Sequence, residues 1–457
     1  LCLYCEEMMC LAVCFHRRAD AAPLAYLPSS FAMKTRTLLA GSVLLVGIVG
    51  LLAAPVPRRP NHDWPQWRGP NHDNVSTESD LLKSWPASGP QLLWTFAAAG
   101  IGYSGPAIVG ERLYTMGADE KNDFVLAVDV AKGKKVWAKP IGPYVRNRYG
   151  SGPRGTPTVD GDRVYALNSS GILACLKTTN GDKVWSVNLI ADLGGGRPNW
   201  NYSESPLVDG DQVICTPGGG RGAMAALNKK TGEVLWRSKD LADPAGYSSA
   251  VPVVVGGVRQ YVQLTMRGVA GVAAKDGRVL WYYPNKKYRT AVIPSPIVHD
   301  NYVYAVAGYG AGSVLLKLTP DGDATKAEQL YNDDAMRLMN DKHEGVVRVG
   351  DCVYGWSDNG GWTCQELTSG KKMWQSRGFG KGSLTSAGGK LYCYSEDKGT
   401  MVLADASPQG WHEISRFTIP RETKRREFRN NVWTHPVIAN GRLYLRDQEL
   451  IFCYKLK

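Results

Sequence analysis

The chain has 457 residues, of which 44% are hydrophobic, so it is long enough to bury a large core. Its formal net charge of +12 favours anionic partners, but the basic residues are spread along the chain and only residues 421–429 form a dense run. We interpret that run as a solvated loop and expect no nucleic-acid partner. The sequence has no Walker loop and no Gly-x-Ser-x-Gly elbow, which argues against P-loop nucleotide enzymes and serine hydrolases.

The N-terminal region has the parts of a secretory signal. A basic stretch at 33–36 precedes an apolar run at 38–54 and a breaker rich in proline and arginine at 55–59. We therefore predict a signal peptide or membrane anchor over residues 33–60, either cut near Ala54 or retained through 38–54 as the only membrane contact. Residues 1–32 precede Met33, and we interpret them as an upstream segment outside the native protein. The expected location is the periplasm or cell envelope.

Two sequence patterns alternate through the rest of the chain. The first reads Pro-x-Val-x-Gly-x-x-Val-Tyr, with clear copies at 106–114, 157–165, 206–214 and 436–444 and weaker ones at 252–261, 296–304, 345–354 and 384–392. The second reads Ala-x-Asp/Asn-x-x-Thr-Gly-x-x-x-Trp and is clearest at 127–137 and 226–236. Looser copies of it end at Trp185, Trp281 and Trp374, and degraded copies lie near Tyr331 and Trp411.

Each pattern predicts a β-hairpin, because short runs rich in β-branched residues flank turns in which glycine accepts a positive φ. Two hairpins make a four-stranded sheet, which recurs every 40–52 residues. A single sheet of this size cannot bury both faces, so the copies must pack face to face around a ring. The eight copies predict an all-β fold, an eight-bladed β-propeller with four-stranded blades over residues 61–457.

The two ends of this region complement one another. The last copy, 436–457, has enough chain for three strands only, whereas residues 92–96 form an unpaired tryptophan-bearing strand near the start. We predict that this N-terminal strand completes the last blade and closes the ring, which removes an open sheet edge.

Six cysteines lie in the predicted propeller: Cys175, Cys215, Cys352, Cys364, Cys393 and Cys453. Each sits in an apolar, strand-like run, so we expect buried free thiols; the alternative is disulfides, for which six cysteines allow fifteen pairings. Within residues 61–457, no Cys-x-x-Cys or His-Glu-x-x-His spacing supports a zinc site.

The pattern that ends in tryptophan resembles the tryptophan-docking repeat of quinoprotein alcohol dehydrogenases and other propellers like those that bind pyrroloquinoline quinone (PQQ). Residues 63–71, Asp-Trp-Pro-Gln-Trp-Arg-Gly-Pro-Asn, resemble the leader of exported bacterial PQQ-like propellers. The resemblance implies one of two classes. The first is a dehydrogenase with PQQ and calcium in the central funnel and an aspartate that assists alcohol oxidation; the second is a protein-binding scaffold such as the outer-membrane assembly factor BamB. The chain lacks the adjacent cysteines common in the dehydrogenases and any Cys-x-x-Cys-His haem site, which favours the scaffold.

The loops that lead from one blade into the inner strand of the next are the expected binding site, because propeller function usually lies at one mouth of the central channel. The predicted funnel residues are Tyr103, Arg154, Arg197, Trp200, Tyr202, Tyr247, Arg289, His343, Glu344, Lys381, Trp433 and His435. Arginine binds carboxylates and aromatic rings stack, so we expect a planar anion: a quinone tricarboxylate, an acidic glycan or an acidic peptide. The alternative interpretation is that these residues cap the blades and fill the channel mouth.

Residues 332–339 form the most irregular insertion, for which we predict a short helix over the channel. A metal at Asp341, His343 and Glu344 is conceivable, but acidic residues in such loops commonly serve turns, and we predict no metal site.

We therefore expect an exported, non-catalytic propeller without a cofactor, which binds an anionic small molecule or an envelope protein partner through its funnel. The alternative is a PQQ-dependent alcohol dehydrogenase that uses calcium, with His343 or Glu344 near the quinone and arginines on its carboxylates. A third hypothesis is a saccharide-binding or polymer-processing protein. Because one fold serves several functions, the sequence leaves open whether the protein is an enzyme.

Overall fold

The computed structural model describes residues 61–332, 338–343, 345–426 and 431–457, and the statements below concern these ranges. The described residues all belong to one compact unit, residues 58–457. The upstream segment expected at 1–32 and the signal or anchor expected at 33–60 lie outside the described residues. Among the residues that are described, no helix has the length and apolarity needed to cross a membrane.

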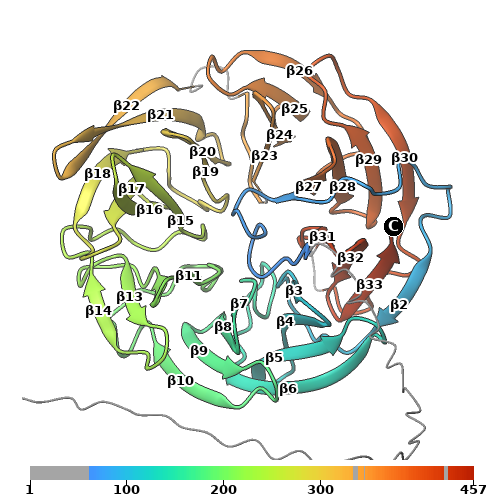
Figure 1. Cartoon of the computed structure of the whole chain (residues 1–457), viewed down its shortest axis with the longest axis horizontal. Helices are drawn as coiled ribbons and strands as arrows, with labels where there is room; N and C mark the ends of the chain where they lie inside the picture. The colour runs from blue at the N-terminus through green and yellow to red at the C-terminus, as the bar shows by residue number, and fades with distance from the viewer. Residues whose placement is uncertain (1–60, 333–337, 344, 427–430) are drawn as a thin grey trace, which may run out of the picture. The chain divides into compact units, whose positions relative to one another are not determined.

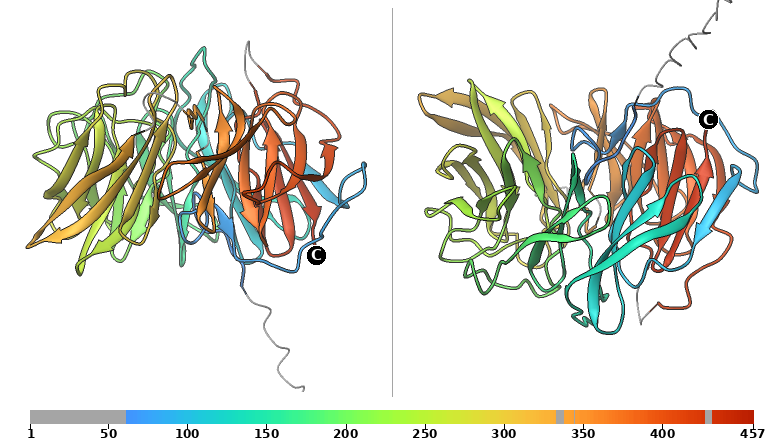
Figure 2. Two further views of the ribbon diagram at one scale, coloured as in Figure 1. Left: turned by 90° about the horizontal axis from the view of Figure 1, so that it is seen from above. Right: turned by 60° about the horizontal axis from the view of Figure 1, so that its bottom comes forward.

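Eight sheets surround a central channel, and the described residues contain strands but no helix (Figure 1). Figure 2 shows the strands of the blades running between the two faces of the ring. Blades one to four are formed by β3 (Ala107–Val109), β4 (Arg112–Ala118), β5 (Asn122–Asp129) and β6 (Lys134–Pro143); β7 (Thr158–Asp160), β8 (Arg163–Leu167), β9 (Ile172–Lys177) and β10 (Lys183–Asn188); β11 (Leu207–Asp209), β12 (Gln212–Cys215), β13 (Ala225–Asn228) and β14 (Val234–Arg237); and β15 (Val251–Val255), β16 (Val258–Leu264), β17 (Gly268–Ala273) and β18 (Val279–Pro284).

Blades five to seven are formed by β19 (Ile297–His299), β20 (Tyr302–Ala307), β21 (Gly312–Asp321) and β22 (Ala324–Asn332); β23 (Val347–Val349), β24 (Cys352–Ser357), β25 (Gly361–Glu366) and β26 (Lys372–Ser376); and β27 (Gly382–Ala387), β28 (Lys390–Ser395), β29 (Thr400–Asp405) and β30 (Glu413–Thr418). The eighth blade combines β31 (Val437–Ala439), β32 (Arg442–Asp447) and β33 (Leu450–Lys455) with β2 (Leu92–Phe96). The predicted all-β, eight-bladed propeller is confirmed.

In five blades, the tryptophan near the end of the outer strand docks its blade on the next one. The indole Nε1 atoms of Trp137 and Trp185 donate to the carbonyl oxygens of Thr178 and Lys229 in the following blades, each at 3.0 Å. A Cβ added to Gly232, in the Thr-Gly turn of blade three, would lie 2.9 Å from the Trp185 ring. The same contact joins Gly133 to Trp94, Gly181 to Trp137 and Gly277 to Trp236. The glycine and the tryptophan of the repeat are therefore the two halves of one contact between blades.

Blade five keeps this contact although its repeat is degraded. Tyr331 stands where the tryptophan would be, and its hydroxyl donates to the carbonyl oxygen of Leu367 in blade six at 2.7 Å. A Cβ on Gly370 would lie 2.9 Å from the Tyr331 ring. The docking contact thus tolerates another large ring with a polar atom at its edge.

This contact predicts a difference between two glycine variants that share a positive φ. Gly232 has φ +80° under the Trp185 ring, whereas Gly210 has φ +58° with nothing within 4 Å of an added Cβ. We expect Gly210→Ala to lower the free energy of unfolding by about 1–2 kcal/mol through its backbone alone. Gly232→Ala should lower it by about 1–3 kcal/mol more, because the indole must move. Urea unfolding of both variants measures the difference, and equal losses would contradict the docking account.

The ring is closed by a strand near its start that completes the blade formed by its end. Strand β2 pairs antiparallel with β33, from Leu92 opposite Tyr454 to Phe96 opposite Ile451, which confirms the predicted closure. Arg446 on β32 strengthens the seam: its side chain is 1% exposed, and its Nη1 donates to the carbonyl oxygens of Ser104 and Met116 in blade one, both at 2.7 Å. Burial lowers the pKa of Arg446 to about 9.

All six cysteines of the propeller are buried and none forms a disulfide, as predicted. Burial raises the pKa of the Cys175 thiol to about 11 and that of Cys364 to about 12. These thiols therefore remain protonated at neutral pH and serve as small apolar core groups.

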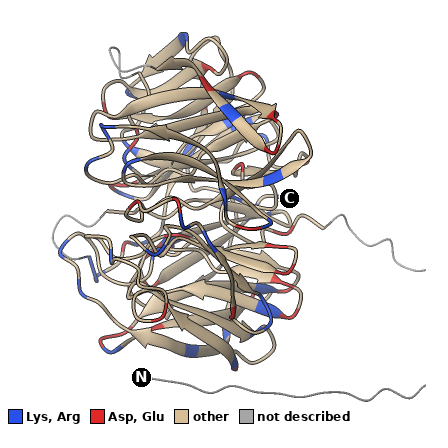
Figure 3. Ribbon diagram, turned by 90° about the vertical axis from the view of Figure 1, so that its left-hand side faces the viewer, with Lys and Arg blue, Asp and Glu red and all other residues tan. Residues whose placement is uncertain are grey.

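Along the ribbon seen in Figure 3, positions of basic and acidic residues are interspersed. Several pair across neighbouring blades; for example, Lys229 lies 2.8 Å from Asp160, and Arg259 Nη2 donates to Asp209 at 2.7 Å. Local ion pairs between blades thus neutralise part of the charge of these strands and turns.

Residues 61–79 run through the channel, and we call them the channel plug. In Figure 1 this blue segment crosses the centre of the ring. Trp64 forms a β-bridge with Ile108 of blade one, and the Pro65 carbonyl accepts the Val159 amide of blade two at 2.8 Å. Farther along, β1 (Val75–Ser76) adds to the inner edge of β27 as a parallel fifth strand. The leader-like segment 63–71 is therefore part of the fold.

Arg68 and Gly69 turn the plug back on itself. Both have positive φ, 62° and 78°, and a Cβ on Gly69 would lie 2.9 Å from the Trp64 ring. The Arg68 side chain is 1% exposed; its Nη2 donates to the Val346 carbonyl at 2.8 Å and its Nε to the His72 carbonyl at 3.1 Å. This buried cation fixes the plug to blade six.

Candidate functional site

A cavity of about 440 Å³ lies where the loops lead into the inner strands. Seven of its lining residues are tryptophans or tyrosines, and we call the cavity the aromatic mouth. The predicted funnel residues that line it are Tyr103, Arg154, Trp200, Tyr247, His343, Trp433 and His435. The others in its wall are Trp67, Tyr149, Ser203, Ser205, Ser249, Thr290, Ile293 and Tyr309.

The structure places three predicted funnel residues elsewhere. Arg197 and Arg289 are exposed on their loops, and Arg289 Nε donates to a backbone carbonyl three residues earlier at 3.0 Å. Tyr202 is 1% exposed in the core between blades two and three, where its hydroxyl donates to the Pro217 carbonyl at 2.9 Å. The expectation that each of these loops sends its cation or ring into the funnel fails here, because solvent or a blade core takes the side chain.

The irregular insertion at 332–339 is only partly described. Residues 333–337 and Glu344 lie outside the described residues, so the predicted helix and the predicted role of Glu344 remain predictions. Asn332 ends β22, and Leu338 and Met339 are buried without helical structure. Over the described ranges, no three histidine, cysteine or acidic residues gather where they would hold a metal ion.

Three rings of the aromatic mouth were not among the predicted residues. Tyr149 lies in the loop before β7 that also carries the predicted Arg154, and the sequence favoured the cation of this loop over its ring. Trp67 belongs to the plug, whose path through the channel no local pattern indicates. Tyr309 sits in the turn between β20 and β21 with φ +58°, a conformation that non-glycine residues rarely adopt. That strained backbone holds a ring that is 46% exposed at the cavity.

Arg154 organises the loops of the mouth. Its Nη1 donates to the Trp200 carbonyl at 2.6 Å, and its Nη2 donates to the carbonyls of Gly150 at 2.6 Å and Tyr149 at 3.4 Å. The guanidinium also lies 5.8 Å from the centre of the Tyr103 ring. Burial lowers the pKa of the Arg154 guanidinium below its ordinary value. The predicted anion-binding cation therefore directs these donors to the loops that carry two rings of the cavity.

The rings form two groups. In the first, the centre of Trp200 lies 5.5 Å from Tyr247, 5.6 Å from Tyr149 and 6.5 Å from Tyr309, with the last pair nearly parallel. In the second, Trp433 lies 5.1 Å from Tyr103. These rings come from loops far apart in the sequence, so the closed ring of blades is what assembles the surface.

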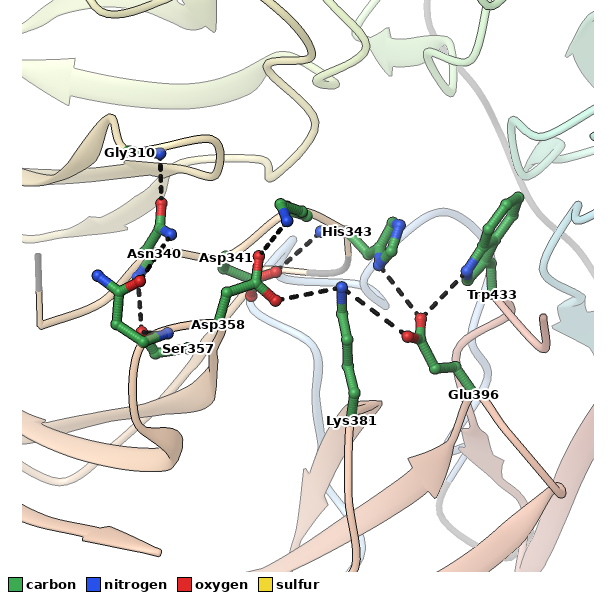
Figure 4. A network of polar contacts seen from close by, with 11 residues as sticks. Gly310, Asn340, Asp341, His343, Ser357, Asp358, Lys381, Glu396 and Trp433 are labelled. Carbon is green, nitrogen blue, oxygen red and sulfur yellow. Dashed lines mark hydrogen bonds and ion pairs between the residues drawn. The ribbon is translucent and has the colours of Figure 1, made fainter. Parts of the chain in front are cut away.

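A polar network supports the second group (Figure 4). Glu396 accepts the Trp433 indole N–H at 3.1 Å, and its carboxylate lies 3.4 Å from His343 Nδ1. Lys381, one of the predicted funnel residues, lies between the carboxylates of Asp358 at 3.3 Å and Glu396 at 3.9 Å. Burial raises the pKa of Glu396, and the Lys381 charge opposes that shift. The network positions His343 and Trp433 and balances the lysine charge beside the cavity.

Both histidines of the mouth are neutral at physiological pH. Burial lowers the pKa of His435 to about 3, and Arg68 adds to this effect. Burial likewise lowers the pKa of His343 well below its usual range, together with the charges of Lys381 and Lys342. His435 lies 4.6 Å from Trp67 and His343 5.3 Å from Trp433, measured between ring centres, so these histidines act as rings within the wall.

A belt of serine hydroxyls joins the entries of the inner strands. Ser205 Oγ accepts the Thr156 amide at 2.8 Å, and Ser249 Oγ accepts the Ser205 amide at 2.9 Å. Ser295 Oγ accepts the Ser249 amide at 3.3 Å and the Trp67 indole N–H at 3.1 Å. A hydroxyl that accepts a hydrogen bond from an amide N–H keeps its own O–H as a donor. The wall of the cavity therefore carries uncharged hydroxyls between its rings.

The channel plug separates two hollows. Trp67 lines the aromatic mouth, whereas Asn61 and Asp63 line a second hollow with Val159 and Gly161 from the far end of blade two's inner strand. The two hollows therefore lie at opposite ends of the inner strands, and residue 61 enters the fold at the end opposite the aromatic mouth.

Glu204, between two serines of the cavity wall, is a buried carboxyl that turns into blade three. Its side chain is 3% exposed and accepts the Thr216 amide at 2.7 Å and the Thr216 hydroxyl at 2.8 Å. Burial raises its pKa from 4.5 to about 8, and these hydrogen bonds only partly oppose the shift. The native state therefore holds a proton on Glu204 at neutral pH.

A pH dependence of stability follows. Between pH 4.5 and about 8 the native state keeps a proton on Glu204 that the unfolded state has lost, so the contribution of Glu204 to the free energy of unfolding should fall as the pH rises through this window. The two neutral histidines contribute in the opposite sense below pH 6.5. The slope should reach about 1.4 kcal/mol per pH unit at most. Glu204→Gln should flatten it, whereas exposed Glu111→Gln should not, as measured by urea unfolding at several pH values. An unchanged slope in Glu204→Gln would contradict a protonated Glu204.

Comparisons with known proteins agree with the fold. A family profile described as "Outer membrane protein assembly factor BamB" matches residues 74–197 and 122–376. The chain is similar to BamB of Salmonella typhimurium, with 23% identity over 324 residues that cover 69% of this chain and 76% of that protein. It is equally similar to BamB of Escherichia coli, with 23% identity over 68% of this chain and 76% of that protein.

Solved structures of the same architecture come from two kinds of protein. BamB from Moraxella catarrhalis aligns with a TM-score of 0.56 and 17% identity, covering 80% of this chain and 98% of that one. Quinohemoprotein alcohol dehydrogenase from Comamonas testosteroni aligns with a TM-score of 0.59 and 13% identity, covering 86% of this chain and 80% of that one. At these identities the likeness concerns the fold alone.

Proposed function

The chain belongs to the family of outer membrane protein assembly factor BamB, and on this premise we propose that it is an exported, non-catalytic propeller of the cell envelope that binds its ligand or partner at the aromatic mouth. The family assignment agrees with the PQQ-like repeat read from the sequence. The curated relatives are themselves named as assembly factors of the outer membrane, which supports a binding role in the envelope.

The observation that carries the proposal is that the polar groups around the cavity bond to the loops and rings of the protein itself. Arg154 donates to three loop carbonyls, and Glu396 accepts from Trp433 beside Lys381. The histidines are held neutral by burial. These groups support a rigid, ring-lined surface, which suits binding by contact rather than acid–base chemistry.

The second candidate function, a PQQ-dependent alcohol dehydrogenase, fits the described residues less well. Calcium takes six to eight oxygen ligands, including carboxylates, but no aspartate or glutamate is among the described residues that line the aromatic mouth. The one nearby carboxylate bonded to a wall ring, Glu396, is already shared between Trp433 and Lys381. The dehydrogenase structures support the fold and give no direct support for the cofactor.

Calorimetric titration of the full chain with PQQ and calcium, followed by a dye-linked alcohol oxidation assay on the same sample, tests the proposal. We expect neither tight one-to-one binding nor dye reduction, because the described cavity offers no carboxylate set for the ion. Tight binding with alcohol-dependent dye reduction would overturn the non-catalytic proposal and establish the dehydrogenase.

A further inference from the structure

Resting on the binding function proposed above, we infer that the aromatic mouth binds an uncharged saccharide chain. Three features of the cavity carry this inference: the arrangement of its rings, the balance of its charges and the hydroxyl groups between the rings. Each bears on the chemistry of the ligand rather than on the fold.

The rings offer flat faces at the depth and at the rim of the cavity. Trp200 lies inside a group of three tyrosines, two of which, Tyr149 and Tyr309, are each 46% exposed. The face of an aromatic ring is negative, and the C–H groups on the face of a sugar ring are weakly positive. Sugar rings therefore stack on such faces, and a row from Trp200 to the exposed rim suits a chain of them better than a single small molecule.

The charges of the cavity do not suit an acidic ligand. Arg154 directs three hydrogen bonds to loop carbonyls, and Asp358 lies 2.9 Å from Lys342 and 3.3 Å from Lys381. Glu396 adds a second carboxylate beside Lys381. A polyanion needs cations whose donors point at it, and here Arg154, Lys342 and Lys381 are bonded to or paired with the protein itself. Arg148 is an exposed cation 4.8 Å from the centre of the Tyr149 ring. The planar anion predicted from the sequence thus loses Arg154, its expected binding partner in the cavity wall.

The hydroxyl groups match an uncharged polar ligand. Ser205 and Ser249 lie in the cavity wall, and each has accepted an amide proton from a neighbouring blade. Their own O–H groups suit the hydroxyl and ring oxygens of a sugar, which accept and donate hydrogen bonds without carrying charge. A cavity of about 440 Å³ falls in the range that holds a ligand of a few rings.

The test is a titration of the purified full chain, followed by tryptophan fluorescence, with cellotetraose, maltotetraose and chitotetraose as separate probes. PQQ without calcium and a hexaglutamate peptide are the acidic comparisons. We expect saturable binding of at least one neutral tetrasaccharide and none of the acidic probes. Because three indoles line the cavity, binding should change the emission directly.

Variants at the rim identify the site. Tyr309→Ala should weaken the binding of that sugar about 2- to 10-fold, as expected for the loss of one stacked ring, and Tyr309→Phe should restore it. Trp200→Ala should weaken it by about 30-fold or more. Tyr144→Ala is the matched control, because Tyr144 precedes the loop of Tyr149 and does not line the cavity. Its binding should equal that of the unaltered chain.

The outcomes separate this inference from the proposed function. If no neutral sugar binds, or if binding survives Trp200→Ala and Tyr309→Ala, the saccharide inference is overturned. Binding of hexaglutamate or PQQ alone would overturn it in favour of an acidic peptide or small anion, with the binding function intact. Only turnover with PQQ and calcium would remove the proposed function itself.

Discussion

The buried guanidinium of Arg68 fixes the channel plug, and the aromatic mouth depends on that plug. Burying an arginine is costly unless its N–H groups find hydrogen-bond acceptors. Here the backbone carbonyls of Val346 in blade six and of His72 in the plug itself accept these hydrogen bonds. The turn that this arginine holds places the neighbouring Trp67 in the wall of the cavity, where its indole reaches Ser295. A channel that would otherwise run through the ring thereby becomes two separate hollows.

The architecture was predictable because its determinants are local and repeated. Glycine under tryptophan is a contact between one blade and the next, as with Gly232 and Trp185, so the well-preserved copies of the repeat indicate the same packing. The closure by residues 92–96 followed from counting strands at the two ends. Neither inference requires knowing where a side chain points across the channel.

The site was less predictable, because its chemistry depends on contacts across the ring. The sequence identified Arg154 as a cation near the mouth. It did not indicate that this arginine would donate its hydrogen bonds to the backbone carbonyls of the loops. It grouped Arg197 with the funnel, although that loop turns the side chain to solvent. The leader around Trp67 was recognised by resemblance only, since a segment that contacts several blades has no periodic signal of its own. The residues that define the site are thus those that lie outside the repeat.

The central claim is that residues 61–79 are an integral part of the fold and divide the channel. Amide hydrogen exchange of the full chain, followed by mass spectrometry, tests this most directly. The account predicts that amides of the plug, such as Trp64 bonded to the Ile108 carbonyl and Asn74 bonded to the Arg68 carbonyl, exchange as slowly as those of the inner strands. Exchange of this segment within seconds, at the rate of an exposed loop, would contradict it.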